Sequence, residues 1–289
     1  YAMQYIRGVG LDEVITELNR LRPSLDLTKA RTKTRPQENA AASQVAKSMI
    51  GSAGRDTLMD SHRQDSQRSR GRPDTSVASD SSVNSGVLLP GQTGDSSLSE
   101  TGKDYWLSVA RIGVQVAEAL KYAHSQGTLH RDIKPSNLLL DQYATVWVAD
   151  FGLAKSLEQD GLTHTGELVG TLRYMPPEQF AGHSDERSDL YSLGLTLYEL
   201  ATLRPAFDTT DRQQLIRAIT DSEPPRPLKI NPQIPRDLET IILKTIEREP
   251  QRRYPCASDL SSELTRFLNN EPLHARPVSS TERVVKWAR

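Results

Sequence analysis

The sequence predicts an α+β fold that is mainly helical and carries one short β-hairpin. Two apolar triplets, residues 138–140 and 146–148, flank a turn at 141–142 and are typical of short paired strands. Around them, apolar residues recur at helical spacing, which indicates helices with one buried face. Residues 192–201 are strongly apolar, so we expect a helix buried at the centre of the fold.

The other elements follow in chain order. An amphipathic helix is expected over 11–21, and two later ones over 238–246 and 257–267. Between them a helix begins near Tyr105, and Gly127 suits its C-terminal stop because glycine adopts the left-handed conformation that often ends helices. The apolar face of that helix is formed by Val109, Ile112, Val116, Leu120 and Ala123.

Composition separates a polar insert from the folded part. Hydrophobic residues make up only 36% of the chain, which is low for a globular domain. No Phe, Trp or Tyr occurs from Ile6 through Asp104, and such a stretch buries too little apolar surface to offset the entropy lost on ordering. We predict that 28–102 is a disordered Ser/Gly-rich insert, between 1–27 with the first helix and 103–272 with the rest of the fold; 273–289 form a C-terminal extension.

A neutral spacer is the simplest role for this insert. An autophosphorylation or docking segment is the alternative, because serines are frequent in it. Its charges are mixed in sign, so binding of nucleic acid is a poor interpretation.

Charge and cysteine content narrow the functional class. The formal net charge of −1 provides no basic field for nucleic acid. The single cysteine, Cys256, excludes an internal disulfide and fits a reducing compartment. No apolar run reaches transmembrane length, and no signal peptide is visible. We expect a cytoplasmic protein, with any membrane tether lying outside these residues.

The strongest chemical signal is the spacing of two acids and an amide. Asp132 lies five residues before Asn137, and Asp150 follows Asp132 by 18 residues. Phosphoryl transfer from ATP needs a carboxylate near the attacking hydroxyl and oxygen ligands for Mg²⁺. This segment can supply both. The full motifs read His130-Arg131-Asp132-Ile133-Lys134-Pro135-Ser136-Asn137 and Asp150-Phe151-Gly152.

These motifs resemble the catalytic core of eukaryotic-type protein kinases. Three later segments also resemble that family in the same order: 170–178, which has Pro176 where the family has Ala, then 188–194 and 249–253. The resemblance implies a protein-kinase-like fold, in which 1–27 hold the hinge and first helix and 103–272 form the C-terminal lobe. It also implies ATP and Mg²⁺ as cofactors and protein substrates as partners.

The resemblance carries roles for five residues at the reaction centre. Asp132 would be the catalytic base, while Asn137 and Asp150 would hold Mg²⁺ on the phosphates. Lys134 would contact the transferred phosphate, and Thr171 would bond the base and this lysine. Lys134 and Thr171 together favour Ser/Thr acceptors.

Other positions are implied to bind the nucleotide or to support the site. Tyr1 to Gly8 looks like the hinge between two lobes, with Met3 as gatekeeper and the backbones of Gln4 and Ile6 facing adenine. Leu139 would pack beneath the adenine. His130 would stack near Phe151, Asp189 would anchor the catalytic-loop backbone, and Glu178 would form a buried ion pair with Arg253.

The segment 162–171 resembles the double-threonine loop of bacterial kinases of the mycobacterial receptor type. We expect Thr163 and Thr165 to be regulatory phosphorylation sites, with Arg131 receiving one phosphothreonine, because its planar fork matches phosphate oxygens. An unmodified threonine-rich surface loop is the alternative. A looser resemblance, at Met3-Gln4-Tyr5-Ile6 and 194–200, is to the large planctomycete-type bacterial kinases.

The sequence contains neither the glycine-rich loop nor the strand lysine of a kinase N-terminal lobe. We therefore expect these 289 residues to be a fragment that is inactive or nearly so by itself, within an active parent. The parent is expected to self-associate for trans-autophosphorylation. The alternatives are a pseudokinase or truncated binding module and, more weakly, a small-molecule kinase.

Overall fold

The structure is a computed structural model, and it describes residues 8–21, 40–50, 97–141, 143–151 and 170–275 of the 289-residue chain. Its elements, in chain order, are β1 (Val9–Gly10), α1 (Leu11–Leu21), α2 (Ala40–Ile50), α3 (Ser97–Ser125), η2 (Pro135–Asn137), β2 (Leu138–Leu140), β3 (Val146–Val148), η3 (Pro177–Ala181), α5 (Glu186–Thr202), α6 (Arg212–Asp221), α7 (Pro227–Ile230), α8 (Arg236–Thr245), η4 (Pro250–Arg252) and α9 (Ala257–Leu268).

The expected hairpin is confirmed as part of a three-stranded antiparallel sheet of order β1-β2-β3. Leu139 lies opposite Trp147 on one side and Gly10 on the other. The turn is closed by Asp141, whose Oδ1 accepts hydrogen bonds from the backbone N–H groups of Tyr143 and Thr145. The sheet is therefore small, and one of its strands leads directly into helix α1.

Helix α5 is the centre of the lobe, as the apolar run predicted. It packs against α3, α7, α8 and α9, and nearly all its residues are buried. A Cβ on Gly194 would lie only 2.6 Å from Ile246 Cγ2, so glycine permits the close approach of α5 to the end of α8. The helix begins at Glu186, earlier than expected, because Asp185 and Ser188 form a capping box at its N-terminus.

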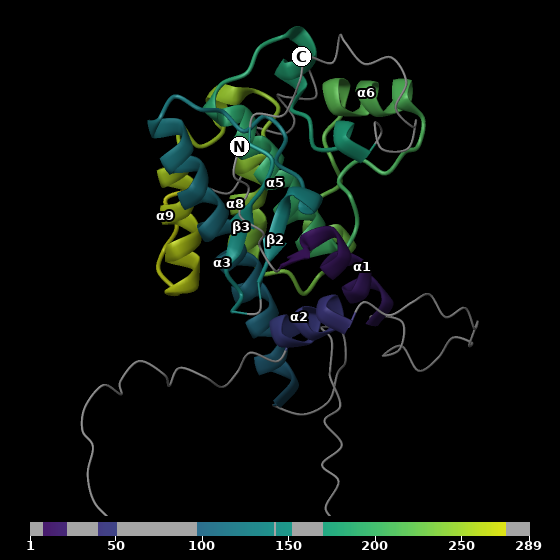
Figure 1. Ribbon diagram of the computed structural model, residues 1–289, viewed down its shortest axis with the longest axis vertical. Coiled ribbons are helices and arrows are strands. Elements are labelled where there is room, and N and C mark those ends of the chain that lie inside the picture. The colour runs from purple at the N-terminus through teal and green to yellow at the C-terminus, as the bar shows by residue number, and fades with distance from the viewer. Residues whose placement is uncertain (1–7, 22–39, 51–96, 142, 152–169, 276–289) are drawn as a thin grey trace, which may run out of the picture.

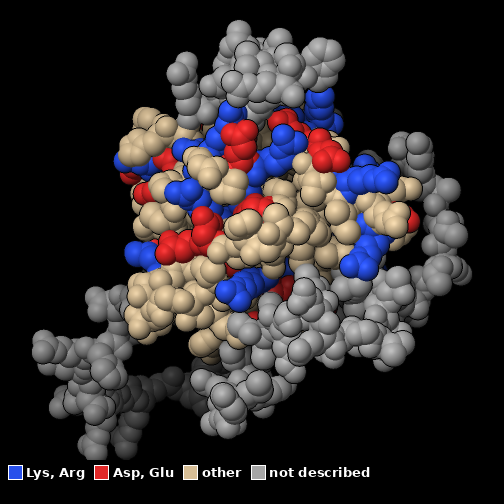
Figure 2. Space-filling view, turned by 90° about the horizontal axis from the view of Figure 1, so that it is seen from above, with Lys and Arg blue, Asp and Glu red and all other residues tan. Residues whose placement is uncertain are grey.

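Helices α3 and α9 lie side by side along one flank of α5, while α1 and α2 pack together on another part of the lobe (Figure 1). The helix predicted over 11–21 is confirmed with those bounds, and α8 and α9 match their expected ranges to within two residues. Gly127 follows α3 with φ of 71°, the left-handed geometry expected at this stop. Charges of both signs are interspersed on the face shown in Figure 2.

The prediction of disorder across 28–102 is wrong for the part that the structure describes. Residues 40–50 form α2, and α3 already begins at Ser97. Ala42, Ala46 and Met49 lie one and two helical turns apart and are buried. The prediction relied on the absence of aromatic residues from this stretch. Alanines can also form the buried face of a helix when the neighbouring elements supply the large side chains. Residues 51–96 lie outside the described part.

The folded lobe also extends slightly past the boundary expected at residue 272. The buried Glu263 carboxylate of α9 accepts hydrogen bonds from the backbone N–H groups of His274 and Ala275, at 2.8 and 2.7 Å. These bonds hold the chain against α9 up to Ala275. None of the helices in the described ranges is long and apolar enough to cross a bilayer.

Candidate active site

The catalytic loop, residues 130–137, connects the end of α3 to β2. Its last turn is η2, in which the Asn137 N–H donates to Lys134 O at 3.0 Å. The Asn137 carbonyl accepts a 2.9 Å hydrogen bond from the N–H of Ala149, just after β3. Because Asp150 is the next residue, the hairpin brings Asp150 to the end of the catalytic loop. Asp150 is exposed and has φ of 61°.

Asp132 lies at the centre of a short polar chain. Its Oδ2 contacts Lys134 Nζ at 2.8 Å and accepts from Asn137 Nδ2 at 3.0 Å. Asn137 Nδ2 also donates to the Asp132 carbonyl at 2.7 Å. Lys134 Nζ reaches Thr171 Oγ1 at 3.0 Å. The structure thus brings together the four residues that the sequence singled out, Asp132, Lys134, Asn137 and Thr171.

His130 has both ring nitrogens occupied. Nδ1 accepts from the backbone N–H of Asp132 at 3.3 Å, so Nε2 carries the proton and donates to the Ala149 carbonyl at 2.9 Å. The ring lies 4.5 Å from that of Phe151, centroid to centroid. This arrangement suits a residue that joins the loop to the segment after β3, and it leaves neither nitrogen free for acid–base chemistry.

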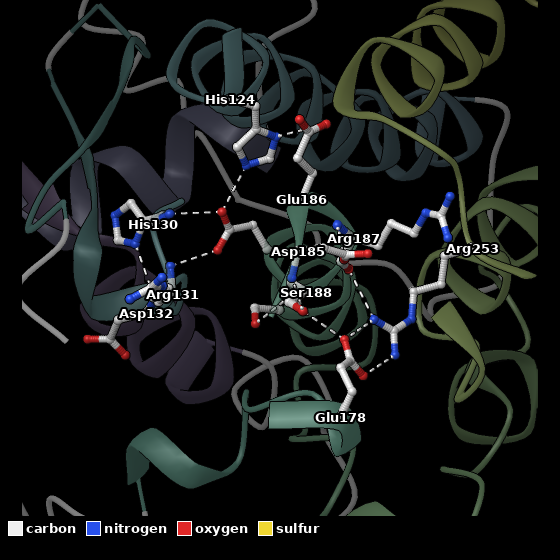
Figure 3. A network of polar contacts seen from close by, with 12 residues as sticks. His124, His130, Arg131, Asp132, Glu178, Asp185, Glu186, Arg187, Ser188 and Arg253 are labelled. Atoms are coloured by element: carbon white, nitrogen blue, oxygen red, sulfur yellow. Dashed lines mark hydrogen bonds and ion pairs between the residues drawn. The ribbon is translucent and has the colours of Figure 1, made fainter. Parts of the chain in front are cut away.

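Asp189, in the first turn of α5, holds the backbone of the catalytic loop (Figure 3). Its Oδ2 accepts from the His130 N–H at 2.8 Å, and its Oδ1 accepts from the Arg131 N–H at 2.7 Å. Its Oδ2 also accepts from Nε2 of the buried His124 at 2.8 Å. Arg131 has φ of 67°, a conformation that is uncommon for a residue with a side chain and that these bonds stabilise.

A second carboxylate, half-buried, lies across the start of α5. Glu178 is paired with Arg253 in a bidentate contact, with NH1 to Oε1 at 2.6 Å and NH2 to Oε2 at 2.8 Å (Figure 3). The other guanidinium hydrogens go to three carbonyl oxygens, those of Arg187, Glu247 and Arg248. The Arg253 side chain is fully buried, and all five of its N–H donors are matched.

The electrostatics of this pair follow from its surroundings. Burial by itself raises the pKa of the Glu178 carboxyl, but the hydrogen bonds and positive charge of Arg253 outweigh it and hold the pKa below its ordinary value. Ser188 Oγ adds a further hydrogen bond, 2.8 Å, to Oε1. Arg253 also lies over the ring of Tyr191, 4.5 Å from its centroid. Glu178 is therefore an anionic anchor.

The segment between Thr171 and η3 is tied to the last turn of α5. The hydroxyl of the half-buried Tyr174 donates to Glu199 at 2.5 Å. Burial, followed by the nearby Glu199 charge and hydrogen bond, raises the pKa of Tyr174. Burial also raises the pKa of Glu199, and the hydrogen bond from Tyr174 opposes that effect only in part. This contact fixes the chain a few residues after Thr171.

The described residues leave some of the expected positions without a structural account. Leu139 lies in β2, half-buried and paired with Gly10. The expected nucleotide contacts Met3, Gln4 and Ile6 lie outside the described residues, as do Thr163 and Thr165. Arg131 is exposed, and within the described part of the chain its guanidinium takes part in no ion pair. These roles remain predictions.

Three supporting residues were not found from the sequence. His124 bonds Asp189, Ser188 bonds Glu178, and Gln115 bonds the hairpin through Val146 N–H and Ala144 O. Each is a single polar residue at a position in a helix, and its partner is distant in sequence. Only Ser188 had a local signal, its place three residues after the helix-capping Asp185.

The fold and this site define the class of protein. A mainly helical lobe with a hairpin that carries Asp132, Asn137 and Asp150 is the arrangement of a protein kinase catalytic region. Residues 94–264 match the protein kinase domain family, and the chain belongs to that family.

The chain is similar to several bacterial kinases. It is 36% identical over 198 residues to a probable serine/threonine-protein kinase of Clostridium acetobutylicum, covering 67% of this chain and 30% of that protein. It is 34% identical over 163 residues to the serine/threonine-protein kinase PrkC of Bacillus subtilis, and 35% over 164 residues to PknB of Mycobacterium tuberculosis. Each match covers 56% of this chain, with 25% of PrkC and 26% of PknB. The chain thus spans about a quarter to a third of these relatives.

Proposed function

We propose that the protein is a serine/threonine protein kinase, which transfers the γ-phosphoryl group of ATP to protein hydroxyl groups. The observation that carries this proposal is the contact chain through Asp132, in which one carboxylate oxygen is shared by Lys134 and Asn137. With Oδ2 held in this way, the carboxylate is fixed in orientation. It points away from the buried network behind it (Figure 3), so its other oxygen can accept a proton from a substrate hydroxyl.

Asn137 and Asp150 are the residues suited to hold Mg²⁺. The amide nitrogen of Asn137 is already committed to Asp132, which leaves its side-chain oxygen as the ligand atom. Among the described residues no cluster of three or more His, Cys, Asp or Glu side chains could bind a metal by itself. Two oxygen ligands fit Mg²⁺, which retains several waters and takes other ligands from nucleotide phosphates. Bound Mg-ATP supplies the transferable phosphoryl group and charge neutralisation.

Lys134 and Thr171 support Ser/Thr acceptors. Lys134 Nζ lies between Asp132 and Thr171, at 2.8 and 3.0 Å, so its charge is directed to the place where the base meets the phosphate. This positive charge can stabilise the phosphoryl oxygens in the transition state of transfer, and the lysine need not take part in proton transfer. The Thr171 hydroxyl holds the lysine in that place.

The test is phosphate transfer from labelled ATP and Mg²⁺ by the complete natural gene product, followed by identification of the phosphorylated amino acids. We expect phosphoserine and phosphothreonine, no phosphotyrosine, and loss of transfer in Asp150→Asn. Absence of transfer by the folded protein, with Mg-ATP binding retained, would favour a non-catalytic binding module. The 289 residues by themselves are expected to transfer phosphate at most slowly, because their sequence has no glycine-rich loop or strand lysine.

Regulation by phosphorylation of Thr163 and Thr165 forms part of the proposal. Arg131 supports it, because its side chain is exposed while its backbone is fixed by Asp189. We further propose self-association for trans-autophosphorylation and a cytoplasmic location of the catalytic region. Mass spectrometry of the active protein should find phosphate on these threonines, and an unmodified loop in fully active protein would contradict the regulatory role.

A further inference from the structure

Helix α2 (Ala40–Ile50) lies outside the residues that match the protein kinase family, yet it is built into the lobe. Ala42, Ala46 and Met49 are 2%, 0% and 5% exposed, and Ala46 and Met49 belong to the main hydrophobic core. The Met49 carbonyl accepts a hydrogen bond from Ser108 Oγ of α3, at 3.4 Å. The packing partners of α2 are α1, α3 and β1. Residues 40–50 are therefore a fixed element and not a spacer.

Helix α1 connects α2 to the candidate active site. Its buried face, which includes Val14 and Leu18, packs against α2 and also against η2 and β2. The turn η2 contains Asn137. Immediately before α1, Gly10 in β1 pairs with Leu139 in β2. A shift of α1 would therefore change the positions of Asn137, the proposed Mg²⁺ ligand, and of Leu139.

Ala46 is completely buried in the main hydrophobic core, and α2 packs against α1. A larger side chain at this position would have to displace its neighbours, because protein interiors are close-packed. Close-packed interfaces of this kind transmit displacement, because they have few voids to absorb it. The α2 contacts are concentrated on α1, α3 and β1, away from the packing of α8 and α9 around α5.

We propose that α2 is a positioning element of the active site, which holds α1 against the turn that carries Asn137 and thereby sets the affinity for Mg-ATP. This inference rests on the proposed kinase function and adds a specific role for part of the insert. The main packing partners of α2 are α1, α3 and β1, so α2 would act on the site through α1 and β1. A neutral spacer would leave nucleotide affinity unchanged.

The experiment compares Ala46→Leu with Gln44→Lys, which places its change on the exposed face of the same helix. The Michaelis constant for ATP and kcat are measured in the complete natural gene product. Hydrogen exchange is measured over residues 8–10 and 135–140. For Ala46→Leu we expect the ATP constant to rise about three- to tenfold, equivalent to a modest loss of binding free energy, with kcat changing less. Exchange over both segments should become faster. Gln44→Lys should match the parent in all three readouts.

Two further variants keep the test decisive. Ala46→Ser keeps a small side chain at this position, so its Michaelis constant for ATP should stay near that of the parent protein. If Ala46→Ser raised this constant as much as Ala46→Leu does, side-chain volume would not be the cause. If Ala46→Leu fails to fold, Met49→Ala loosens the same interface by removing contacts and should raise the ATP constant in the same direction.

The possible failures are distinguishable. An unvaried protein that transfers no phosphate overturns the proposed function. An active protein in which Ala46→Leu and Met49→Ala leave both the ATP constant and exchange unchanged overturns the role of α2. Activity that falls only in proportion to the folded fraction, with an unchanged ATP constant, also overturns it.

Discussion

Asp132 and Asp150 reach solvent beside the small sheet, whereas around the first turn of α5 Asp189 is buried and Glu178 is largely covered by the ion pair with Arg253. The Asp132 side chain is 25% exposed, and its polar contacts with Lys134 and Asn137 lie at Oδ2 and at the backbone carbonyl. The Asp189 side chain is 2% exposed, and three donors share its two oxygens. The first pair is accessible to a substrate and the second is fully satisfied by the protein.

The two groups of carboxylates differ in what their environment requires of them. A buried carboxylate is stable only when donors or cations replace the water it has lost, so its removal or the removal of a partner affects folding. An exposed carboxylate needs little from the fold and can interact with a substrate. Substitutions in the exposed pair should therefore change the rate of reaction, and substitutions in the buried pair should first change stability.

The largest effect is expected for Asp132→Asn. Loss of the proposed general base should lower kcat by about 10²- to 10⁴-fold. The free energy of unfolding should fall by only about 1 kcal/mol, because the partly exposed side chain loses its ion pair with Lys134 while no charge is left fully buried. Steady-state phosphate transfer and chemical denaturation measure the two quantities. Asp208→Asn, at a side chain that is 75% exposed, is the control. A loss of stability as large as that of Arg253→Ala would contradict the assignment of Asp132 to the reaction and not to the fold.

Arg253→Ala should give the largest loss of stability. The substitution strands the Glu178 carboxylate and three carbonyl oxygens, and such breaks in buried pairs typically cost about 3–5 kcal/mol. Denaturant unfolding of this variant is compared with Arg252→Ala, the neighbouring arginine with a 41% exposed side chain. The control should stay near the parent protein. An unchanged unfolding midpoint in Arg253→Ala would show that the pair does not stabilise the fold.

Asp189→Asn tests the connection between the two kinds of region. It replaces the charge-assisted hydrogen bonds from the catalytic-loop backbone, each worth about 1.5–3 kcal/mol, by weaker ones to the amide oxygen. The amide NH2 group, being a donor, cannot accept a hydrogen bond from the other backbone N–H group. We expect a smaller loss of stability than in Arg253→Ala, together with faster hydrogen exchange at His130 and Arg131. Glu186→Gln, on the same turn of α5 but with a 47% exposed side chain, is the control. Protection that persists in Asp189→Asn would mean that the loop is held elsewhere.

The smallest expected effect is a change in the acid dependence of stability. The pKa of Glu178 is lowered in the folded protein. The stability that its carboxylate contributes is therefore fully present at a pH above the ordinary pKa of 4.5. That contribution is lost as the pH falls through the lowered folded pKa. Glu178→Gln removes this group, and its free energy of unfolding should vary less with pH below 4.5. Unfolding is measured across that range, with the exposed Glu271→Gln as reference; parallel acid limbs in parent and Glu178→Gln would contradict the lowered pKa.

Local patterns were sufficient for most of the helices, both hairpin strands and the spacing of the reaction centre. The helix over 11–21 has a strong amphipathic period, and the apolar run around Gly194 could only be a buried element. The polar insert misled the prediction at α2, because the burial of Ala46 depends on α1 and α3 and not on the composition of α2 itself. His124 was missed for the same reason, since its partner Asp189 lies 65 residues away.

Residue types and their spacing along the chain were enough to identify the family, the central helix and the order of Asp132, Asn137 and Asp150. Tertiary structure alone decided which oxygen of Asp132 is occupied, how Asp189 holds Arg131 in a left-handed conformation, and where α2 docks. Those features depend on distances between segments that are far apart in sequence, and only the folded packing brings them together.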